Sequence, residues 1–344
     1  MRPVKWNVAA AFFADKDAVW LDDFIQDDGL VFTKIHPVRH NNHWHLKPGS
    51  KTTLGMWWDH FAQARQAFKG DPDGIITCFP QLAICCALIR KLRVFGQARP
   101  RLIAYNFNLG GLSDGPRRKL AMWVAGQIEK FIVHSPSEVG PYARYLGVPE
   151  HKVVFIPLQR GAPSVVRAED KTSPFILSMG SAGRDYESLV AVVRDLNIPT
   201  VIVTRADIAA GLPASDTITY LSGLSAAECM DLLCRCRLSV TPVKNLTSAS
   251  GQITFINAMR LGVPTVATEC PGTQGYIDHD ETGMLVRPFD KDDLKDTIAR
   301  LWSDPDLRDR IGKAGREKAE EHFSDERVAA RLQQVLHAAI LPPR

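Results

Sequence analysis

A polar loop in the C-terminal half of the sequence, residues 244–251, combines residue types that bind phosphate. It follows a β-branched stretch that ends near Val243 and precedes an expected helix, whose first N–H groups carry partial positive charge and lack partners. Gly251 allows close approach to the backbone, and Lys244 supplies a full charge. Further donors are Ser248, Ser250, Gln252 and Thr254. The loop predicts a pyrophosphate cradle; the competing interpretation is an ordinary helix with a Ser- and Thr-rich cap.

The segments that position this loop alternate between short apolar strands and helices. Strands are expected over residues 74–79, 101–107 and 130–135, and over 174–180, 200–204, 217–223, 237–243, 264–268 and 283–288. Helices are expected over 56–68, 81–93 and 116–127, and over 185–196, 225–233, 253–261, 290–302, 306–322 and 325–339. This alternation predicts an α/β fold with two Rossmann-like parallel sheets. A Pro- and charge-rich stretch, residues 157–174, is the expected linker between them.

The two halves of the 344-residue chain differ in charge. Residues 1–160 carry 21 Lys and Arg against 13 Asp and Glu, whereas the remainder carries 21 against 25. Six of the seven Trp and seven of the ten His also lie in the first half. The small net charge of +4 therefore conceals two parts with different surfaces and different expected roles.

Several classes of protein are excluded by composition. We expect no membrane-spanning helix, because no apolar run reaches 18 residues, and no signal peptide, because the N-terminus lacks a long apolar core. The seven Cys are scattered and odd in number, which favours a reduced, cytoplasmic protein. Zinc is not expected, since no second pair follows Cys234 and Cys236. A nucleic-acid partner is not expected either, because no recognition motif is present.

The residues around the polar loop resemble a known family. Ala258-Met259, Leu261 to Pro264 and Glu281 to Val286 match, in order and spacing, the C-terminal domain of the retaining family 4 glycosyltransferases, which have the GT-B fold. Residues 178–186 are similar to the first phosphate loop of that family, and residues 131–157 are similar to the end of its N-terminal domain. The resemblance covers about residues 101–325.

The resemblance implies a domain organisation. An acceptor-binding domain is expected over residues 1–160 and a nucleotide-sugar-binding domain over 161–325. The two are expected to face each other across a cleft. A C-terminal helix, residues 326–344, is expected to cross back to the first domain.

The resemblance also implies roles for individual residues. Arg184 and Lys244 correspond to the cations that neutralise the donor diphosphate and stabilise its departure. The other expected donor-binding residues are Gly180, Gly183, Gly223, Leu224, Ser250, Gly251, Gln252, Thr254 and Asn257. Weaker candidates on the acceptor side are Asn106, Asn108, His43 and Asp22. The sugar donor is expected to be a UDP- or GDP-sugar, and no metal is expected.

This chain departs from the family pattern at several positions. Ala249 stands where the family has the first Glu of a pair, and Asn257 stands in place of the second, which normally binds the ribose hydroxyls. An amide keeps hydrogen-bonding capacity there but loses the charge. The glycine-rich loop after the first strand is replaced by residues 9–14, and the usual His after a central strand is missing from residues 104–108.

The resulting prediction is a hexosyltransferase-type enzyme, most simply a retaining one, acting in bacterial polysaccharide or glycoconjugate assembly. In a retaining reaction the leaving phosphate accepts the acceptor's proton. An inverting enzyme needs a base instead, for which Asp15, Asp22, Asp23 and His43 are candidates. The residues are also compatible with a sugar-nucleotide epimerase and with an inactive nucleotide-sugar-binding partner protein.

Three further patterns have a structural and a functional interpretation. Asp71-Pro72-Asp73 and Asp304-Pro305-Asp306 have the spacing of metal-binding D-x-D motifs, but Pro beside Asp is also typical of turns, which we expect here. His40, His43 and His45 are expected in a surface or acceptor-side loop within residues 36–55 rather than at a metal.

The third pattern is the clustering of basic residues near Trp57 and Trp58. They are Arg90, Lys91, Arg93, Arg99, Arg101, Arg117, Arg118 and Lys119. Basic residues attract anionic membranes at about 1 kcal/mol each, so these clusters indicate either peripheral contact with the inner face of the cell membrane or a solubilising surface. The expected partners are thus a nucleotide sugar, a lipid-linked or saccharide acceptor and an anionic membrane surface.

Overall fold

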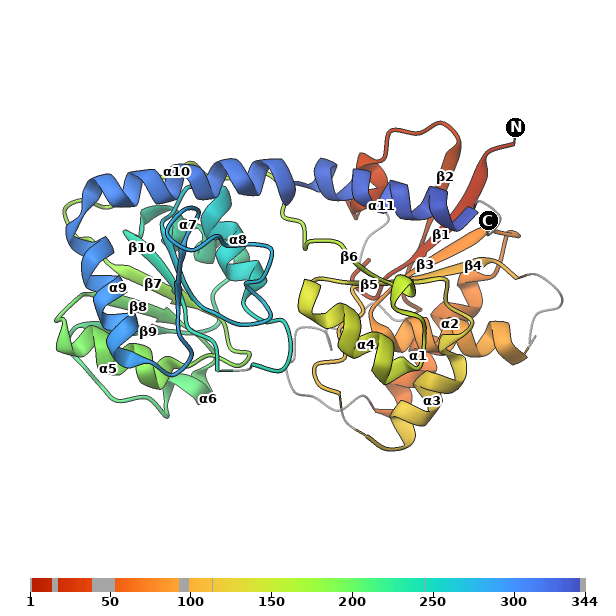
Figure 1. Cartoon of the computed structure of the whole chain (residues 1–344), viewed down its shortest axis with the longest axis horizontal. Coiled ribbons are helices and arrows are strands. Elements are labelled where there is room, and N and C mark those ends of the chain that lie inside the picture. The colour runs from red at the N-terminus through yellow and green to blue at the C-terminus, as the bar shows by residue number, and fades with distance from the viewer. Residues whose placement is uncertain are drawn as a thin grey trace. The chain divides into compact units, whose positions relative to one another are not determined.

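The structure is a computed structural model that describes residues 2–13, 18–38, 53–92, 99–112, 114–244 and 246–340. It divides into two compact units (Figure 1). Unit 1 comprises Met1–Ile156 and Val328–Arg344, and unit 2 comprises Pro157–Arg327. Among the described residues, no helix combines the length and the apolar character needed to cross a membrane.

Unit 1 is built on a six-stranded parallel sheet with the order β2-β1-β3-β4-β5-β6. Its strands are β1 (Val4–Ala9), β2 (Leu30–Ile35), β3 (Gly74–Cys78), β4 (Arg101–Tyr105), β5 (Lys130–Val133) and β6 (Val153–Phe155). The strand order reverses between β1 and β3. The carboxyl ends of the strands at such a reversal diverge and leave a crevice where ligands bind in many α/β folds.

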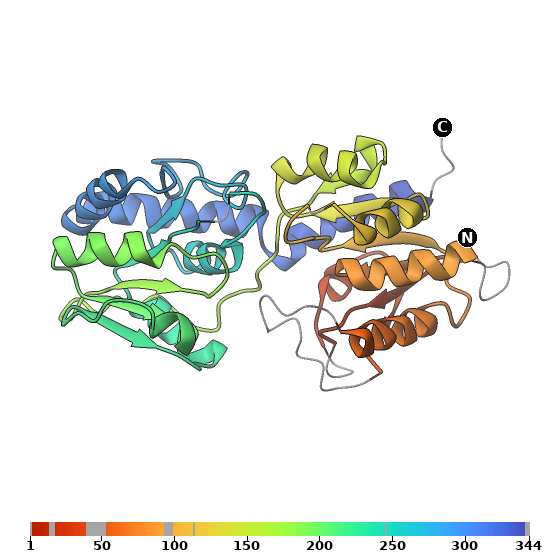
Figure 2. The same ribbon diagram turned by 90° about the horizontal axis from the view of Figure 1, so that it is seen from below.

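Helices cover both faces of this sheet. On one face lie α1 (Leu54–Ala67), α2 (Pro80–Leu92), α3 (Pro116–Ala125) and α4 (Val139–Leu146), which pack on a common apolar core (Figure 2). The other face packs against the 3₁₀ helix η1 (Leu21–Phe24) and against α11 (Asp325–Ile340). Two short 3₁₀ helices, η3 (Pro136–Glu138) and η4 (Glu150–Lys152), flank α4.

Local sequence signals fix the helix starts in unit 1. The Thr53 hydroxyl caps α1 by accepting a 3.3 Å hydrogen bond from the Met56 amide, so the helix begins at Leu54, within the expected loop. Residues 39–52 of that loop lie outside the described residues. Pro116 occupies the first turn of α3, where its missing N–H costs nothing.

Unit 2 repeats the same architecture, with the strand order β12-β11-β10-β7-β8-β9 and parallel pairing throughout. Its strands are β7 (Ile176–Met179), β8 (Thr200–Val203), β9 (Ile218–Leu221), β10 (Leu238–Thr241), β11 (Thr265–Thr268) and β12 (Met284–Val286). The order reverses between β7 and β10, so the crevice of this sheet is framed by the loops that follow these two strands.

The helices that lie wholly within unit 2 are α5 (Tyr186–Asp195), α6 (Ala206–Ala209), α7 (Ala226–Arg235), α8 (Gln252–Arg260), α9 (Lys291–Ser303) and α10 (Pro305–His322). One apolar core lies against α5 and α9, and the other lies against α7 and α8. The predicted pair of parallel α/β sheets is confirmed.

Candidate functional site

The N-terminus of α8 lies at the strand-order reversal of unit 2 and has an unusual start. Gly251 precedes the helix in a left-handed conformation with φ of +89°, and a Cβ there would lie 3.0 Å from Thr241 Cγ2. Only glycine fits this position without strain. Glycine has no side chain with which to cap the helix. The first turn therefore presents backbone donors and the positive end of the helix dipole to the crevice.

Arg184 lies beside this helix start and is almost fully buried, with 9% of its surface exposed. Nε donates to the Met179 carbonyl oxygen at 3.1 Å, and Nη1 donates to the Ala182 carbonyl oxygen at 3.0 Å. Nη2 donates to Thr254 Oγ1 at 3.1 Å, and Nη1 lies 3.5 Å from Ser250 Oγ. All four acceptors are neutral, so the positive charge at the crevice is not cancelled by these contacts.

Burial lowers the pKa of the Arg184 guanidinium, because removal from water disfavours its charged form. Among the described residues, no carboxylate pairs with it. A buried cation without a counter-charge is costly unless an anion arrives. Arg184 therefore places a buried positive charge beside the α8 N-terminus.

Backbone pairing holds the two predicted cations next to each other. The Lys244 amide donates to the Gly183 carbonyl oxygen at 2.9 Å, and Arg184 forms an isolated antiparallel bridge with Val243. Gly180, with φ of +119°, makes room for the guanidinium, because a Cβ there would lie 2.6 Å from Arg184 Nη2. The loops after β7 and β10 are thus paired and form one continuous wall of the crevice.

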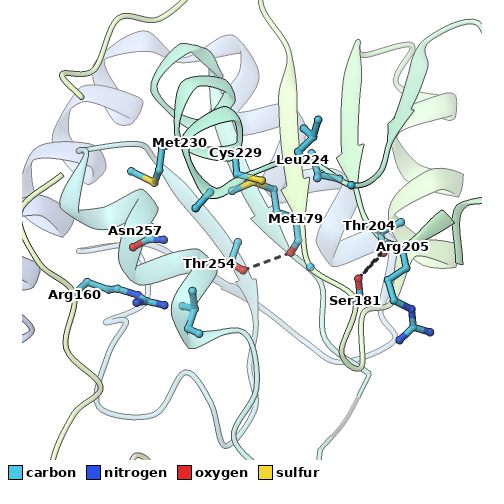
Figure 3. A pocket seen from close by; sticks show the side chains of 15 residues that line it. Arg160, Met179, Ser181, Thr204, Arg205, Leu224, Cys229, Met230, Thr254 and Asn257 are labelled. Carbon is cyan, nitrogen blue, oxygen red and sulfur yellow. Dashed lines mark hydrogen bonds between the residues drawn. The ribbon is translucent and has the colours of Figure 1, made fainter. Parts of the chain in front are cut away.

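A pocket of about 500 Å³ opens beside this wall. Most of its lining is apolar and comes from Met179, Val203, Leu224, Ala226, Cys229, Met230 and Ile253. Its polar lining comes from Arg160, Ser181, Thr204, Arg205, Thr254 and Asn257, with Gly180 and Gly223 completing it. In Figure 3, Arg160 and Asn257 lie at one end, and Ser181, Thr204 and Arg205 lie at the other. The volume and the mixed lining suit a nucleoside with polar groups at both ends.

Arg160 is a pocket residue that the sequence did not single out. It lies in the linker, where its amide donates to the Phe323 carbonyl oxygen at 2.8 Å. Its Nε is buried without a hydrogen-bond partner among the described residues. Burial lowers the pKa of Arg160, an effect that the nearby Asp325 carboxylate opposes. A cation placed in this way at a pocket needs a polar partner that a ligand can supply.

The remaining predicted donor residues divide into two groups. Gly180, Gly223, Leu224, Thr254 and Asn257 line the pocket, whereas Gly183, Arg184, Lys244, Ser250, Gly251 and Gln252 do not. Gln252 Nε2 donates to the Tyr276 hydroxyl at 3.3 Å, and that hydroxyl also accepts from the Leu158 amide at 2.8 Å. Gln252 therefore helps to anchor the linker.

A turn at residues 270–273 packs against the loop that leads into α8. A Cβ on Gly272 would lie 2.2 Å from the Ser250 carbonyl oxygen, so the two backbones are in direct contact. Thr273 stabilises the turn, since its hydroxyl donates to the Cys270 carbonyl oxygen at 3.0 Å and accepts from the Cys270 amide at 3.1 Å. The turn fixes the position of Ser250 beside Arg184.

The predicted acceptor-side residues lie in unit 1, apart from His43, which is outside the described residues together with His40, His45 and Asp15. Asp22 lies on η1, with Oδ2 3.5 Å from Lys34 Nζ. Burial, reinforced by Asp23, raises the Asp22 pKa to about 6, and its Oδ1 has no hydrogen-bond partner among the described residues. Asn106 and Asn108 follow β4, and Asn106 has a left-handed φ of +51°.

One aspartate of each D-x-D motif stabilises the fold. Asp73 pairs with Arg2 at 2.6 Å and accepts from the Lys5 amide at 2.9 Å. Asp304 caps α10 by accepting from the Leu307 amide at 2.9 Å, so the second motif is a helix start rather than the expected turn. Among the described residues, no group of three His, Cys, Asp or Glu side chains is arranged to hold a metal ion.

The fold defines a class of protein. The sucrose-phosphate synthase from Thermosynechococcus elongatus matches with a TM-score of 0.74 at 17% identity, over 97% of this chain and 98% of that one. HepE from Anabaena in complex with UDP and glucose matches with a TM-score of 0.68 at 12% identity, over 97% and 100%. The predicted GT-B fold is therefore confirmed.

The sequence comparison then gives a family match within unit 2. Residues 167–318 match the model of the family Glycosyl transferases group 1, which confirms the expected resemblance of this segment. The MMP alpha-(1->4)-mannosyltransferase of Mycolicibacterium hassiacum is 31% identical over 46% of this chain. A GDP-mannose-dependent alpha-(1-6)-phosphatidylinositol monomannoside mannosyltransferase of Mycobacterium tuberculosis is 28% identical over 36%. The matched segments span about a third of these two relatives, 36% and 33% of their lengths.

Proposed function

We propose that the chain transfers a hexosyl group from a nucleoside diphosphate sugar to an acceptor hydroxyl. The observation that carries the proposal is the junction of the 500 Å³ pocket with the α8 N-terminus, where buried Arg184 has no carboxylate partner among the described residues. The nucleoside occupies the pocket. The diphosphate lies at the helix start, near Arg184, Lys244 and Gly251.

The chemistry follows from charge. The bond between the anomeric carbon and the diphosphate oxygen breaks, and the leaving group gains negative charge. Fixed cations and backbone dipoles that face this oxygen stabilise the transition state without reorganising. Arg184 and the first turn of α8 provide such a fixed field, and Lys244 adds a flexible charge at the rim. Asn257 donates to and accepts from hydroxyl groups of the bound nucleotide.

We assign a retaining reaction that needs no metal. The acceptor oxygen bonds to the anomeric carbon, and its proton passes to the departing phosphate, so no protein base is required. Among the described residues, no carboxylate pairs with Arg184, the buried cation beside the helix start where the diphosphate lies. The retaining outcome predicts that the new linkage keeps the anomeric configuration of the donor.

An inverting reaction is the second candidate, and Asp22 is the observation that favours it. Its carboxyl group has a pKa raised to about 6 and a buried oxygen without a partner among the described residues. A carboxylate with a pKa near the working pH is suited to accept a proton from an acceptor hydroxyl. In this case Asp22→Asn abolishes transfer, whereas in the retaining case it leaves transfer largely intact.

The acceptor is proposed to be a lipid-linked or free saccharide in bacterial polysaccharide or glycoconjugate assembly. Two of the matching relatives are named as acting in such settings: one on a phosphatidylinositol mannoside and another, from Staphylococcus aureus, in capsular polysaccharide biosynthesis. We place the enzyme in the cytoplasm, at the inner face of the cell membrane. The basic surplus of residues 1–160 supports attraction to anionic lipids.

A thermal-shift screen against UDP-, GDP- and ADP-sugars tests the donor proposal, because a ligand of the native state raises the melting temperature. The expected result is stabilisation by one nucleotide class, with slow release of the nucleoside diphosphate, unchanged by EDTA. If no donor in the panel binds or is turned over, the proposal fails. Binding without turnover identifies a nucleotide-sugar-binding partner protein instead, and conversion of one donor sugar into another identifies an epimerase.

A further inference from the structure

Unit 1 contains an apolar groove that the donor site does not use. It has a volume of about 460 Å³ and lies between α1, α2 and α3. Its lining is Leu54, Trp57, Trp58, Phe61, Ile84, Cys85, Leu88 and Leu120. All eight side chains are apolar or aromatic, so the groove offers a ligand contact surface but almost no hydrogen bonding.

Two of these side chains are strongly exposed. Leu54 is 89% exposed and Trp58 is 68% exposed. The Trp58 ring stacks on Phe61 with a centroid distance of 6.3 Å and an interplanar angle of 27°, which holds it over the groove. A clustered apolar surface of this kind is unfavourable in water and marks a binding site in many proteins.

A second, smaller pocket of about 150 Å³ adjoins the groove and shares Trp57, Ile84 and Leu120 with it. Its other lining residues include Gln81, Asn108 and Arg117, all of which have polar side chains. It lies where α2 and α3 begin and after β4 ends. The two cavities form one site with an apolar part and a polar part, which we call the amphiphile groove.

The polar part carries net positive charge. Arg117 is exposed, and no carboxylate pairs with it among the residues that the structure describes. Its neighbour Arg118 is paired with Asp114 at 2.5 Å, and Lys91 lies 4.9 Å above the ring of Trp123. Among the described residues that line the smaller pocket, Arg117 is therefore the cation available to a ligand, and an anionic group complements it.

We propose that the amphiphile groove binds an anionic single-chain lipid, with the hydrocarbon chain against Trp58 and Leu88 and a phosphate at Arg117. The proposal rests on the proposed function, since such a lipid would be the carrier of the acceptor. Charge complementarity favours this occupant over a neutral peptide or a second copy of the chain. The apolar part fixes the chain, and the polar part orients the headgroup beside Asn108.

Calorimetric titration with alkyl phosphates below their micelle concentration tests the proposal. Each added methylene that enters the groove is expected to tighten binding about fourfold, until the groove is full. Inorganic phosphate is expected neither to bind nor to compete, and decanol is expected to bind at least tenfold more weakly than decyl phosphate. Equal binding of decanol and decyl phosphate would overturn the assignment of the headgroup to Arg117.

Paired variants separate the two parts of the groove. Arg117→Gln is expected to weaken decyl phosphate binding about tenfold and to leave decanol binding unchanged. Lys119→Gln, the matched control on the same helix, is expected to change binding less than twofold. Trp58→Ser is expected to weaken both ligands at least fivefold, whereas Phe289→Ser, a control at a side chain 61% exposed in unit 2, is expected to weaken neither. Equal effects within either pair contradict the proposal.

Two further measurements separate lipid binding from other uses of the groove. Nucleoside diphosphate binding by the same samples reports on unit 2, so its loss would count against the proposed function, whereas loss of decyl phosphate binding alone counts against the groove. Sedimentation of the full chain tests whether a second copy occupies it. A dimer that Trp58→Ser dissociates and decyl phosphate leaves intact would overturn the proposal.

Discussion

Both sheets of this protein reverse their strand order once, between β1 and β3 in unit 1 and between β7 and β10 in unit 2. In unit 2, the loops at the reversal contribute Gly180, Arg184 and Gly251. In unit 1, the corresponding loop after β1 contributes Phe12 and Phe13, whose rings lie 5.2 Å apart. Phe12 also lies 6.0 Å from Phe79, which follows β3.

The comparison shows that topology and residue type have separate effects. The same parallel sheet with the same reversal yields an anion cradle where glycines expose backbone amides and a buried arginine adds charge. It yields an aromatic cluster where phenylalanines occupy the corresponding loops. In unit 1, the amphiphile groove lies beside the sheet, between helices, and depends on Trp58 and Arg117 rather than on a phosphate loop.

Among the variants considered, removal of Arg184 is expected to weaken anion binding by unit 2 the most. Arg184→Ala eliminates the fixed charge beside α8, and we expect the affinity for free nucleoside diphosphate to fall about 100-fold, in the range of a lost charge-assisted contact. Affinity for the nucleoside alone should change little. Calorimetry with both ligands measures the difference. Unchanged diphosphate affinity would remove Arg184 from the site.

Arg160 provides the next test, because it places a cation at the opposite end of the pocket from Arg205 (Figure 3). Arg160→Ala is expected to weaken nucleotide binding about tenfold, since the variant loses a partly buried donor that has no partner on Nε among the described residues. Arg316→Ala, at an arginine paired with Glu320 on α10, is the control and should have no effect. Equal affinities for both variants would make Arg160 a linker residue only.

In unit 1, the buried Asp22 is expected to make the stability of the protein depend on pH. Its pKa rises from 3.8 to about 6 in the fold, chiefly through burial and then through Asp23, while Lys34 acts in the opposite direction. The folded state thus favours the neutral carboxyl group. The contribution of Asp22 to the stability of the fold is fully present below pH 4 and is lost as the pH rises through 6.

We expect Asp22→Asn to gain about 1–2 kcal/mol relative to the wild type between pH 4 and pH 7, with water access to the site limiting the effect. Chemical denaturation at both pH values measures it. Asp28→Asn, at an exposed position of the same segment, should show no such gain. Parallel curves for the wild type and Asp22→Asn would show that the burial of Asp22 has no energetic consequence.

The sequence predicts unit 2 better than unit 1 for a physical reason. Gly251, Lys244 and the helix start are contiguous, so local rules for helix termini identify the cradle. Arg160 lies far from them in the chain, and only the folded linker brings it to Asn257. No local signal marked it.

In unit 1, three of the six strands, β3, β4 and β5, were recognisable from their apolar runs, whereas the groove depends on three separate helices. The basic clusters, Arg117 among them, suggested a membrane-contacting or solubilising surface near Trp57 and Trp58, yet the sequence could not show that Arg117 and Trp57 would line the same pocket. Gln252 illustrates the opposite case. Its position at a helix start suggested a ligand contact, while the fold turns its amide toward Tyr276.

Lys244 is expected to have the smallest effect of the cations in unit 2. Its side chain is exposed, so its interaction with a bound diphosphate is screened by water and salt, unlike that of buried Arg184. Lys244→Ala should weaken diphosphate binding about threefold in low salt and hardly at all at about 0.5 M salt, whereas the Arg184→Ala deficit should persist at both. Calorimetry at the two salt concentrations separates the residues. Equal salt sensitivity of the two deficits would mean that burial does not distinguish them and that the cradle acts through net charge alone.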